Sequence, residues 1–121
     1  MKKSVLSIIL VVLVVAVAFS GCKKTEKPTP KSSECEILVF ADGSKGWTIN
    51  NNTLMITTSY TKIQSQHLHN MAPTITVSPG ATVSPASGVA QDFSEGNKVV
   101  YVVTAEDGTT TRTYEAQAVV N

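Results

Sequence analysis

The 121-residue chain has few of the residues on which catalytic sites and disulfide scaffolds depend. It has two cysteines, two histidines and one tryptophan. No Gly-x-Ser-x-Gly, His-Glu-x-x-His or phosphate-binding loop occurs, so no nucleophile has a recognisable base. Charged residues make up only 16% of the chain, and the formal net charge is +1. That balance provides no basic face, which excludes nucleic acid as an expected partner.

A hydrophobic run does occur, at the N-terminus. Lys2 and Lys3 precede an apolar segment, residues 5–19, that only Ser7 interrupts. The run is shorter than the about 20 apolar residues that span a bilayer. It fits a secretory leader with a charged start, an apolar centre and a small-residue exit, so residues 1–21 are predicted to be removed. The alternative is a single uncleaved anchor helix.

The leader ends at Phe19-Ser20-Gly21-Cys22, which resembles the processing box of bacterial lipoproteins. The resemblance implies cleavage between Gly21 and Cys22 and a diacylglyceryl thioether, with further acyl chains such as palmitate, on Cys22. Cys35 would then have no partner within the chain. It is predicted to be an unreactive thiol at the start of a strand, and the alternative is an intermolecular disulfide. Residues 22–33 contain two prolines and no large apolar residue, so they predict a disordered, solvated tether.

The remainder, residues 34–121, is predicted to be one domain without a helical period. The mature chain as a whole, residues 22–121, has 8 basic against 9 acidic side chains. Strands are expected at Glu36–Phe40, Trp47–Ile49, Thr53–Tyr60, Met71–Ser78, Lys98–Ala105 and Thr110–Val120. An irregular segment or one helical turn is expected over residues 62–70.

The strongest pattern is the last pair of strands. Asp107-Gly108 between two β-type runs predicts a hairpin. Both faces of the first of these strands carry valines, which predicts that Val100 and Val102 are covered as well as Tyr101. In the preceding loop, Val89 and Phe93 are expected to point inward. Short strands separated by turn residues are typical of an all-β, antiparallel sandwich.

Two segments then resemble a known family. Residues 80–94 (GATVSPASGVAQDFS) and residues 99–110 (VVYVVTAEDGTT), followed by Thr113-Tyr114, are similar to an immunoglobulin-like domain of unknown function from Bacteroidetes outer-membrane and surface lipoproteins. The resemblance covers residues 36–120. It implies a small Ig-like β-sandwich, often N-terminal to glycan-related or adhesive domains, and it provides no catalytic residues to transfer.

Four residues are candidates for a ligand site. Trp47 and Tyr60 carry large rings that sugars can stack on, although a lone tryptophan beside a strand is more often part of a core. His67 and His69 would share a face if their segment were extended, but no third metal ligand is visible near them, so no metal site is predicted.

Two classes of function remain open at this stage. The first is a non-catalytic binding or spacer module, attached to the membrane by its lipid and contacting a glycan or a partner lipoprotein, with no cofactor. The second is a small metal-dependent or hydrolytic enzyme that uses His67, His69 and nearby acids. The sequence favours the first class, located in the cell envelope as an outer-membrane lipoprotein, on either the periplasmic side or the cell surface.

Overall fold

A computed structural model describes residues 30–121, and residues 31–121 form one compact unit. The predicted leader, the cleavage site at Gly21 and Cys22 lie outside the described residues. Within residues 30–121, no helix has the length and apolarity needed to cross a membrane.

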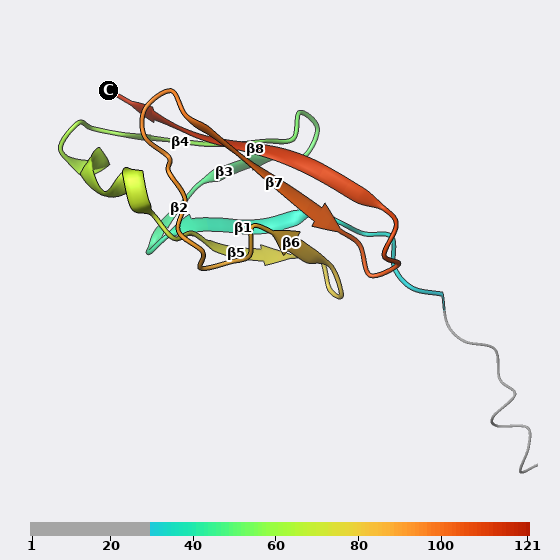
Figure 1. Ribbon diagram of the computed structural model, residues 1–121. Coiled ribbons are helices and arrows are strands. Elements are labelled where there is room, and N and C mark those ends of the chain that lie inside the picture. The colour runs from blue at the N-terminus through green and yellow to red at the C-terminus, as the bar shows by residue number, and fades with distance from the viewer. Residues whose placement is uncertain (1–29) are drawn as a thin grey trace, which may run out of the picture. The chain divides into compact units, whose positions relative to one another are not determined.

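The unit contains eight strands and one 3₁₀ helix. They are β1 (Ile37–Asp42), β2 (Lys45–Gly46), β3 (Thr48–Asn50), β4 (Met55–Tyr60), η1 (Gln64–Asn70), β5 (Thr74–Val77), β6 (Thr82–Ser84), β7 (Lys98–Thr104) and β8 (Thr111–Val120). They form two layers, a sheet in the order β2-β1-β5 and a sheet in the order β3-β4-β8-β7-β6 (Figure 1). The predicted all-β sandwich is confirmed, with one exception to the antiparallel pairing, since β4 and β8 run parallel.

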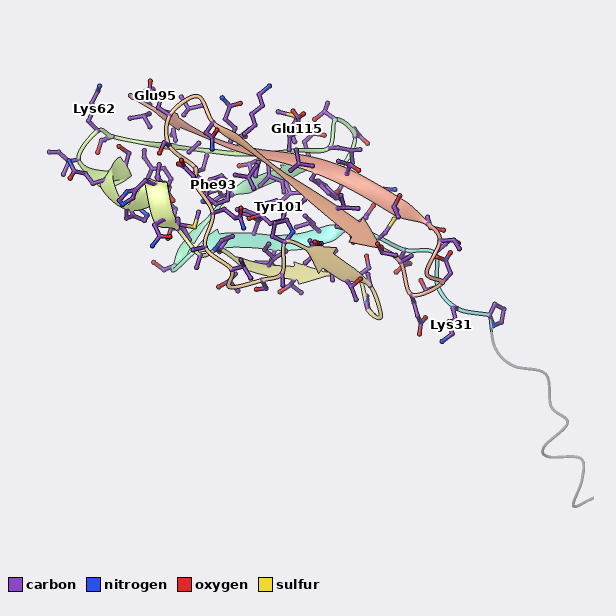
Figure 2. All side chains as sticks on the ribbon, in the orientation of Figure 1. Lys31, Lys62, Phe93, Glu95, Tyr101 and Glu115 are labelled. Atoms are coloured by element: carbon purple, nitrogen blue, oxygen red, sulfur yellow. The ribbon has the colours of Figure 1, made fainter. Side chains whose placement is uncertain are left out.

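The core lies between the two sheets and contains every aromatic residue of the described chain. Phe40, Trp47, Tyr60, Phe93, Tyr101 and Tyr114 each have at most 6% of their surface exposed. Alternation along the strands places Tyr60, Tyr101 and Tyr114 there, because alternate side chains of a strand point to the same face. Trp47 and Phe93 enter the core from segments outside the strands. Figure 2 shows Phe93 and Tyr101 between the layers, where their rings stack at a centroid distance of 6.5 Å.

Two inward predictions were wrong. Val89 is 45% exposed, whereas Phe93, predicted together with it, is fully buried. Val100 and Val102 of β7 are 48% and 37% exposed. Within residues 30–121 the only layer packed on the five-stranded sheet is the three-stranded one, so the opposite face of β7 stays open to solvent.

The β7–β8 hairpin was predicted correctly, and hydrogen bonds within its turn define it. Asp107 accepts bonds from the amides of Thr109 and Thr110, each at 2.8 Å, and Gly108 adopts φ +77°. Bonds from the Thr110 hydroxyl and amide are the main reason that the pKa of Asp107 falls to about 2. The turn therefore stabilises the ionised form of this carboxylate.

A second turn, at Pro79-Gly80, connects the two sheets. Gly80 has φ +82°, and Ala81 donates to the carbonyl of Ser78 at 2.9 Å, as expected for a type II turn. A Cβ at Gly80 would lie 2.9 Å from the Cβ of Glu106. Glycine is therefore needed here both for its backbone angle and for space.

The residues before β1 are held against the β7–β8 turn. The carbonyl of Ser32 accepts from the amide of Asp107 at 3.0 Å, and the Ser32 amide donates to Glu106 at 3.0 Å. At the other end, the amide of Asn121 donates to the carbonyl of Tyr60 at 2.8 Å. Lys31 and the C-terminus therefore lie at opposite ends of the sandwich (Figures 1 and 2).

Tyr101 provides a first testable prediction. Its ring is fully buried, and its hydroxyl has no hydrogen-bond partner within residues 30–121. Burial raises the pKa of this phenol above its ordinary value. An unsatisfied buried polar group costs about 1–3 kcal/mol, so Tyr101→Phe is expected to raise the free energy of unfolding by about 1 kcal/mol. Thermal melts measure this as a Tm increase of about 4–8 °C. A lower Tm would contradict the expectation.

Candidate functional site

A cluster of polar and aromatic side chains gathers around Asp42 at the end of the sandwich that carries η1. Tyr60 donates its hydroxyl hydrogen to Asp42 Oδ2 at 2.6 Å, and His67 Nε2 lies 2.5 Å from the same oxygen. The Trp47 indole donates to the Tyr60 hydroxyl at 3.3 Å, and Lys45 Nζ lies 5.0 Å from the centre of the Tyr60 ring. We call these five residues the Asp42 cluster.

The positions of the cluster residues follow from where the chain reverses direction. Asp42 is the last residue of β1 and Tyr60 is the last residue of β4, so both strands end at the same edge of the core. Gly43, with φ +60°, turns the chain back so that Lys45 faces the cluster. The last turn of η1 then brings His67 over Asp42.

The electrostatics of the cluster favour a fixed charge pattern. Burial raises the pKa of Asp42, but hydrogen bonds from Tyr60 and His67 and the charge of Lys45 outweigh it, so the net shift is downward. Burial and the neighbouring Asp42 carboxylate raise the pKa of the Tyr60 phenol above its ordinary range. At neutral pH the carboxylate is therefore ionised and the phenol is protonated, which suits a structural tie between β1, β4 and η1.

Replacement of the Asp42 carboxylate tests this tie. Asp42→Asn weakens the two charge-assisted bonds, and because the site is partly open to solvent the expected loss is about 1 kcal/mol at pH 7. A lowered folded-state pKa contributes stability above the ordinary Asp pKa of 3.8, and that contribution is lost as the pH falls through the lowered value. Thermal melts should therefore differ at pH 7 and converge near pH 2, with a smaller loss for His67→Gln. Identical melts at pH 7 would contradict the tie.

Trp47 and Tyr60, two of the four predicted ligand contacts, belong to the core. Their exposed fractions are 6% and 4%, and their ring centroids lie 6.3 Å apart. Phe40 and Phe93 pack against Trp47 at 5.0 and 5.3 Å. In this conformation neither ring offers a free face on which a sugar can stack.

His67 and His69 were expected to share a face only if their segment were extended, and it is not. In η1, consecutive residues turn by about 120°, so residues two apart point in different directions. His67 contacts Asp42, whereas His69 Nδ1 lies 2.9 Å from the carbonyl of Gln66. Across residues 30–121, no three His, Cys, Asp or Glu side chains are placed to hold a metal ion together.

Asp42 and Lys45 were not identified from the sequence. Asp42 stands in an Asp-Gly pair, which is common in turns and therefore gave no separate signal, and Tyr60 and His67 are 18 and 25 positions away in the chain. Trp47, Tyr60 and His67 could be singled out by residue type, but only the folded chain shows that Asp42 is the acid that contacts Tyr60 and His67.

The acidic side chains of the unit are largely committed to the fold. Six of the eight acids in residues 30–121 accept hydrogen bonds or form ion pairs: Glu36, Asp42, Asp92, Glu106, Asp107 and Glu115. Glu36 and Arg112, for example, lie 3.1 Å apart. These contacts orient most of the carboxylates toward other groups of the fold.

Two recesses are present on the surface of the unit. One, of about 370 Å³, is formed by Ser33, Glu34, Cys35, Glu36, Leu38, Ser78, Pro79 and Arg112. Cys35 is a buried free thiol there. The other, of about 390 Å³, lies on the outer face of the five-stranded sheet and is formed by Thr48, Thr57, Thr58, Ser59 and Val119. We call this second recess the threonine hollow.

Residues 37–118, almost the whole folded unit, match the family model described as "SGBP, N-terminal". The chain belongs to this family. SGBP N-terminal domains are a Bacteroidetes surface-glycan-binding family. The resemblance found in the sequence was therefore right about Bacteroidetes surface proteins, whereas the assignment to an Ig-like domain of unknown function is not confirmed.

Solved structures that resemble this SGBP N-terminal domain are of longer chains, and the domain spans less than a third of each. One is a proposed glycoside hydrolase from Bacteroides thetaiotaomicron, with TM-score 0.63 and 26% identity, covering 79% of this chain and 28% of that one. Another is a DUF4623 family protein from Bacteroides eggerthii, with TM-score 0.54 and 14% identity, covering 72% and 21%. The second likeness shows the fold alone. A comparison with curated proteins finds no match.

Proposed function

We propose that this SGBP N-terminal domain is a non-catalytic module that takes part in glycan capture at the cell envelope, anchored in the outer membrane through a lipidated Cys22. The observation that carries the proposal is the family match, which extends over residues 37–118 and therefore over nearly all of the folded unit. The lipoprotein processing box at residues 19–22 supports the anchor.

A non-catalytic role agrees with the side chains available. The acids are mostly bound within the fold, and the Asp42 cluster combines an ionised carboxylate with a protonated phenol. The similar protein from Bacteroides thetaiotaomicron is a proposed glycoside hydrolase, but this chain spans only 28% of it. Its activity therefore provides weak grounds for assigning catalysis to this unit.

A spacer role within the same apparatus is the second candidate. It is favoured by the opposite placement of Lys31 and Asn121, because a module with its ends far apart adds length between an anchor and whatever it presents. It is also favoured by the burial of all six aromatic rings in residues 30–121, since aromatic faces are common platforms for sugars.

Retention of fluorescent polysaccharides by whole cells tests the proposal. Cells that produce the chain should retain more glycan than cells that lack it. A chimera distinguishes the binding role from the spacer role: in it, an unrelated domain of equal length replaces residues 34–121. Retention lost in that chimera supports a direct role, and retention preserved supports a spacer. Equal retention with and without the protein would contradict both.

A further inference from the structure

The threonine hollow lies on the open face of the five-stranded sheet, and its surroundings follow from strand pairing. Thr48 of β3 lies directly across from Thr57 of β4, and Ser59 lies across from Val119 of β8. Ile56 and Tyr60 of the same strand are buried, so Thr57 and Ser59 point outward. The hollow is therefore built on three adjacent strands whose other face is fixed by the core.

The lining of the hollow is uncharged and rich in hydroxyl groups. Four of its five residues carry a hydroxyl, and the threonine methyl groups and Val119 provide apolar contact between them. Elsewhere, the hydroxyls of Ser65, Ser94 and Thr110 bond to nearby protein oxygens. Within residues 30–121, none of the hydroxyls of the hollow makes such a bond. Those of Thr48, Thr57 and Ser59 lie on the outer face and remain available to a ligand, whereas Thr58 shares the core-facing side of β4 with Ile56 and Tyr60.

From this geometry we infer that the threonine hollow is a contact site for a neutral saccharide, an inference that rests on the proposed function in glycan capture. A neutral sugar presents hydroxyls that donate and accept, together with apolar C–H faces, and it brings no charge that would have to be buried unpaired. The lining offers the same combination of groups. Recognition here uses hydroxyls and methyl groups in place of a stacked aromatic ring, because the aromatic rings of this unit are in the core.

The open form of the site predicts weak binding. Each hydrogen bond made at a solvent-accessible surface adds little net free energy, so affinity for one short oligosaccharide is expected to be in the millimolar range. A polysaccharide that meets many anchored copies would be held far more tightly through multivalency. Such a site suits a molecule that retains long glycans at a surface.

The test uses the mature chain, residues 22–121, in a detergent without a sugar headgroup. Neutral oligosaccharides of glucan, mannan and xylan are titrated while amide NMR shifts are recorded, with a uronic-acid oligosaccharide as the charged comparison. A neutral oligosaccharide is expected to shift Thr48, Thr57, Ser59 and Val119. Thr57→Val, which keeps the shape and removes the hydroxyl, is expected to weaken binding about fivefold.

Thr113→Val is the matched control, since Thr113 is exposed on the same face of the sheet. In β8, Gln117 is paired with Thr57, and Thr113 lies four residues before Gln117. That spacing is about 13 Å. The control should bind like the wild type. Shifts at another surface, equal binding by Thr57→Val, or self-association without saccharide would overturn the inference. If cells retain glycan but the titration shifts no amide signal at the hollow, the inference about this site is wrong and the proposed function is unaffected.

Discussion

Replacement of Tyr114 by alanine is expected to lower the free energy of unfolding by about 4 kcal/mol, the usual range for a buried aromatic ring being about 3–5 kcal/mol. Tyr114 is fully buried in β8, and its hydroxyl connects three parts of the fold. It accepts from the buried amide of Ile37 at 3.1 Å and donates to the side chain of Asn51. The substitution therefore removes ring packing and leaves a buried amide of β1 without its partner.

Thermal and urea unfolding measure the Tyr114 effect. A loss of this size corresponds to a fall in Tm of roughly 15–30 °C for a unit of this length. Tyr114→Phe retains the ring and removes only the hydroxyl, so it should lie between the wild type and Tyr114→Ala. A Tm within 2 °C or so of the wild type for Tyr114→Ala would show that β8 does not depend on this residue, contrary to its complete burial.

Cys22→Ser is expected to move the protein from the membrane fraction to the soluble fraction almost completely. A serine has no thiol to carry the diacylglyceryl group, and two or more acyl chains are needed for stable anchoring. Cell fractionation and intact-mass measurement read out the change, because the lipid mass should vanish with the membrane association. Cys22 lies outside the described residues, so this prediction stands on the sequence alone.

Cys35→Ser is the control for the lipid prediction. Cys35 is a buried free thiol beside β1, so its substitution should leave the protein in the membrane fraction with its lipid mass intact. If Cys22→Ser and the wild type partition alike, and their masses differ only by the exchange of sulfur for oxygen, the leader is not processed as proposed.

The sequence predicted the sandwich because its strands obey a strict physical rule. Alternation along β8 places Tyr114, Ala116 and Ala118 on one face, and all three are buried. Local turn chemistry at Asp107-Gly108 was equally readable. What could not be read was partner choice, since β4 pairs with β8 in parallel across more than fifty residues. The start of β4 was also misplaced, because Leu54 has φ +60° and cannot continue a strand.

The candidate sites were harder to predict than the fold. Trp47, Tyr60 and His67, predicted as ligand contacts from residue type, lie together in the structure, but they meet at Asp42, a residue that only the folded chain brings near. The threonine hollow gave no signal of its own, because threonine is common in strands for reasons of propensity. It is visible only once β3, β4 and β8 are aligned. Exposure of Val100 likewise depended on which face lacked a covering layer.

The placement of the two chain ends also determines how the unit would respond to mechanical force. Tension applied between Lys31 and Asn121 runs along the strands, because these residues lie at opposite ends of the sandwich. Both terminal strands are interior to their sheets, β1 between β2 and β5, and β8 between β4 and β7. Such a force must shear two ladders of hydrogen bonds together and cannot peel an edge strand one bond at a time. Tension between the two ends would therefore meet more resistance than the same force applied to an edge strand.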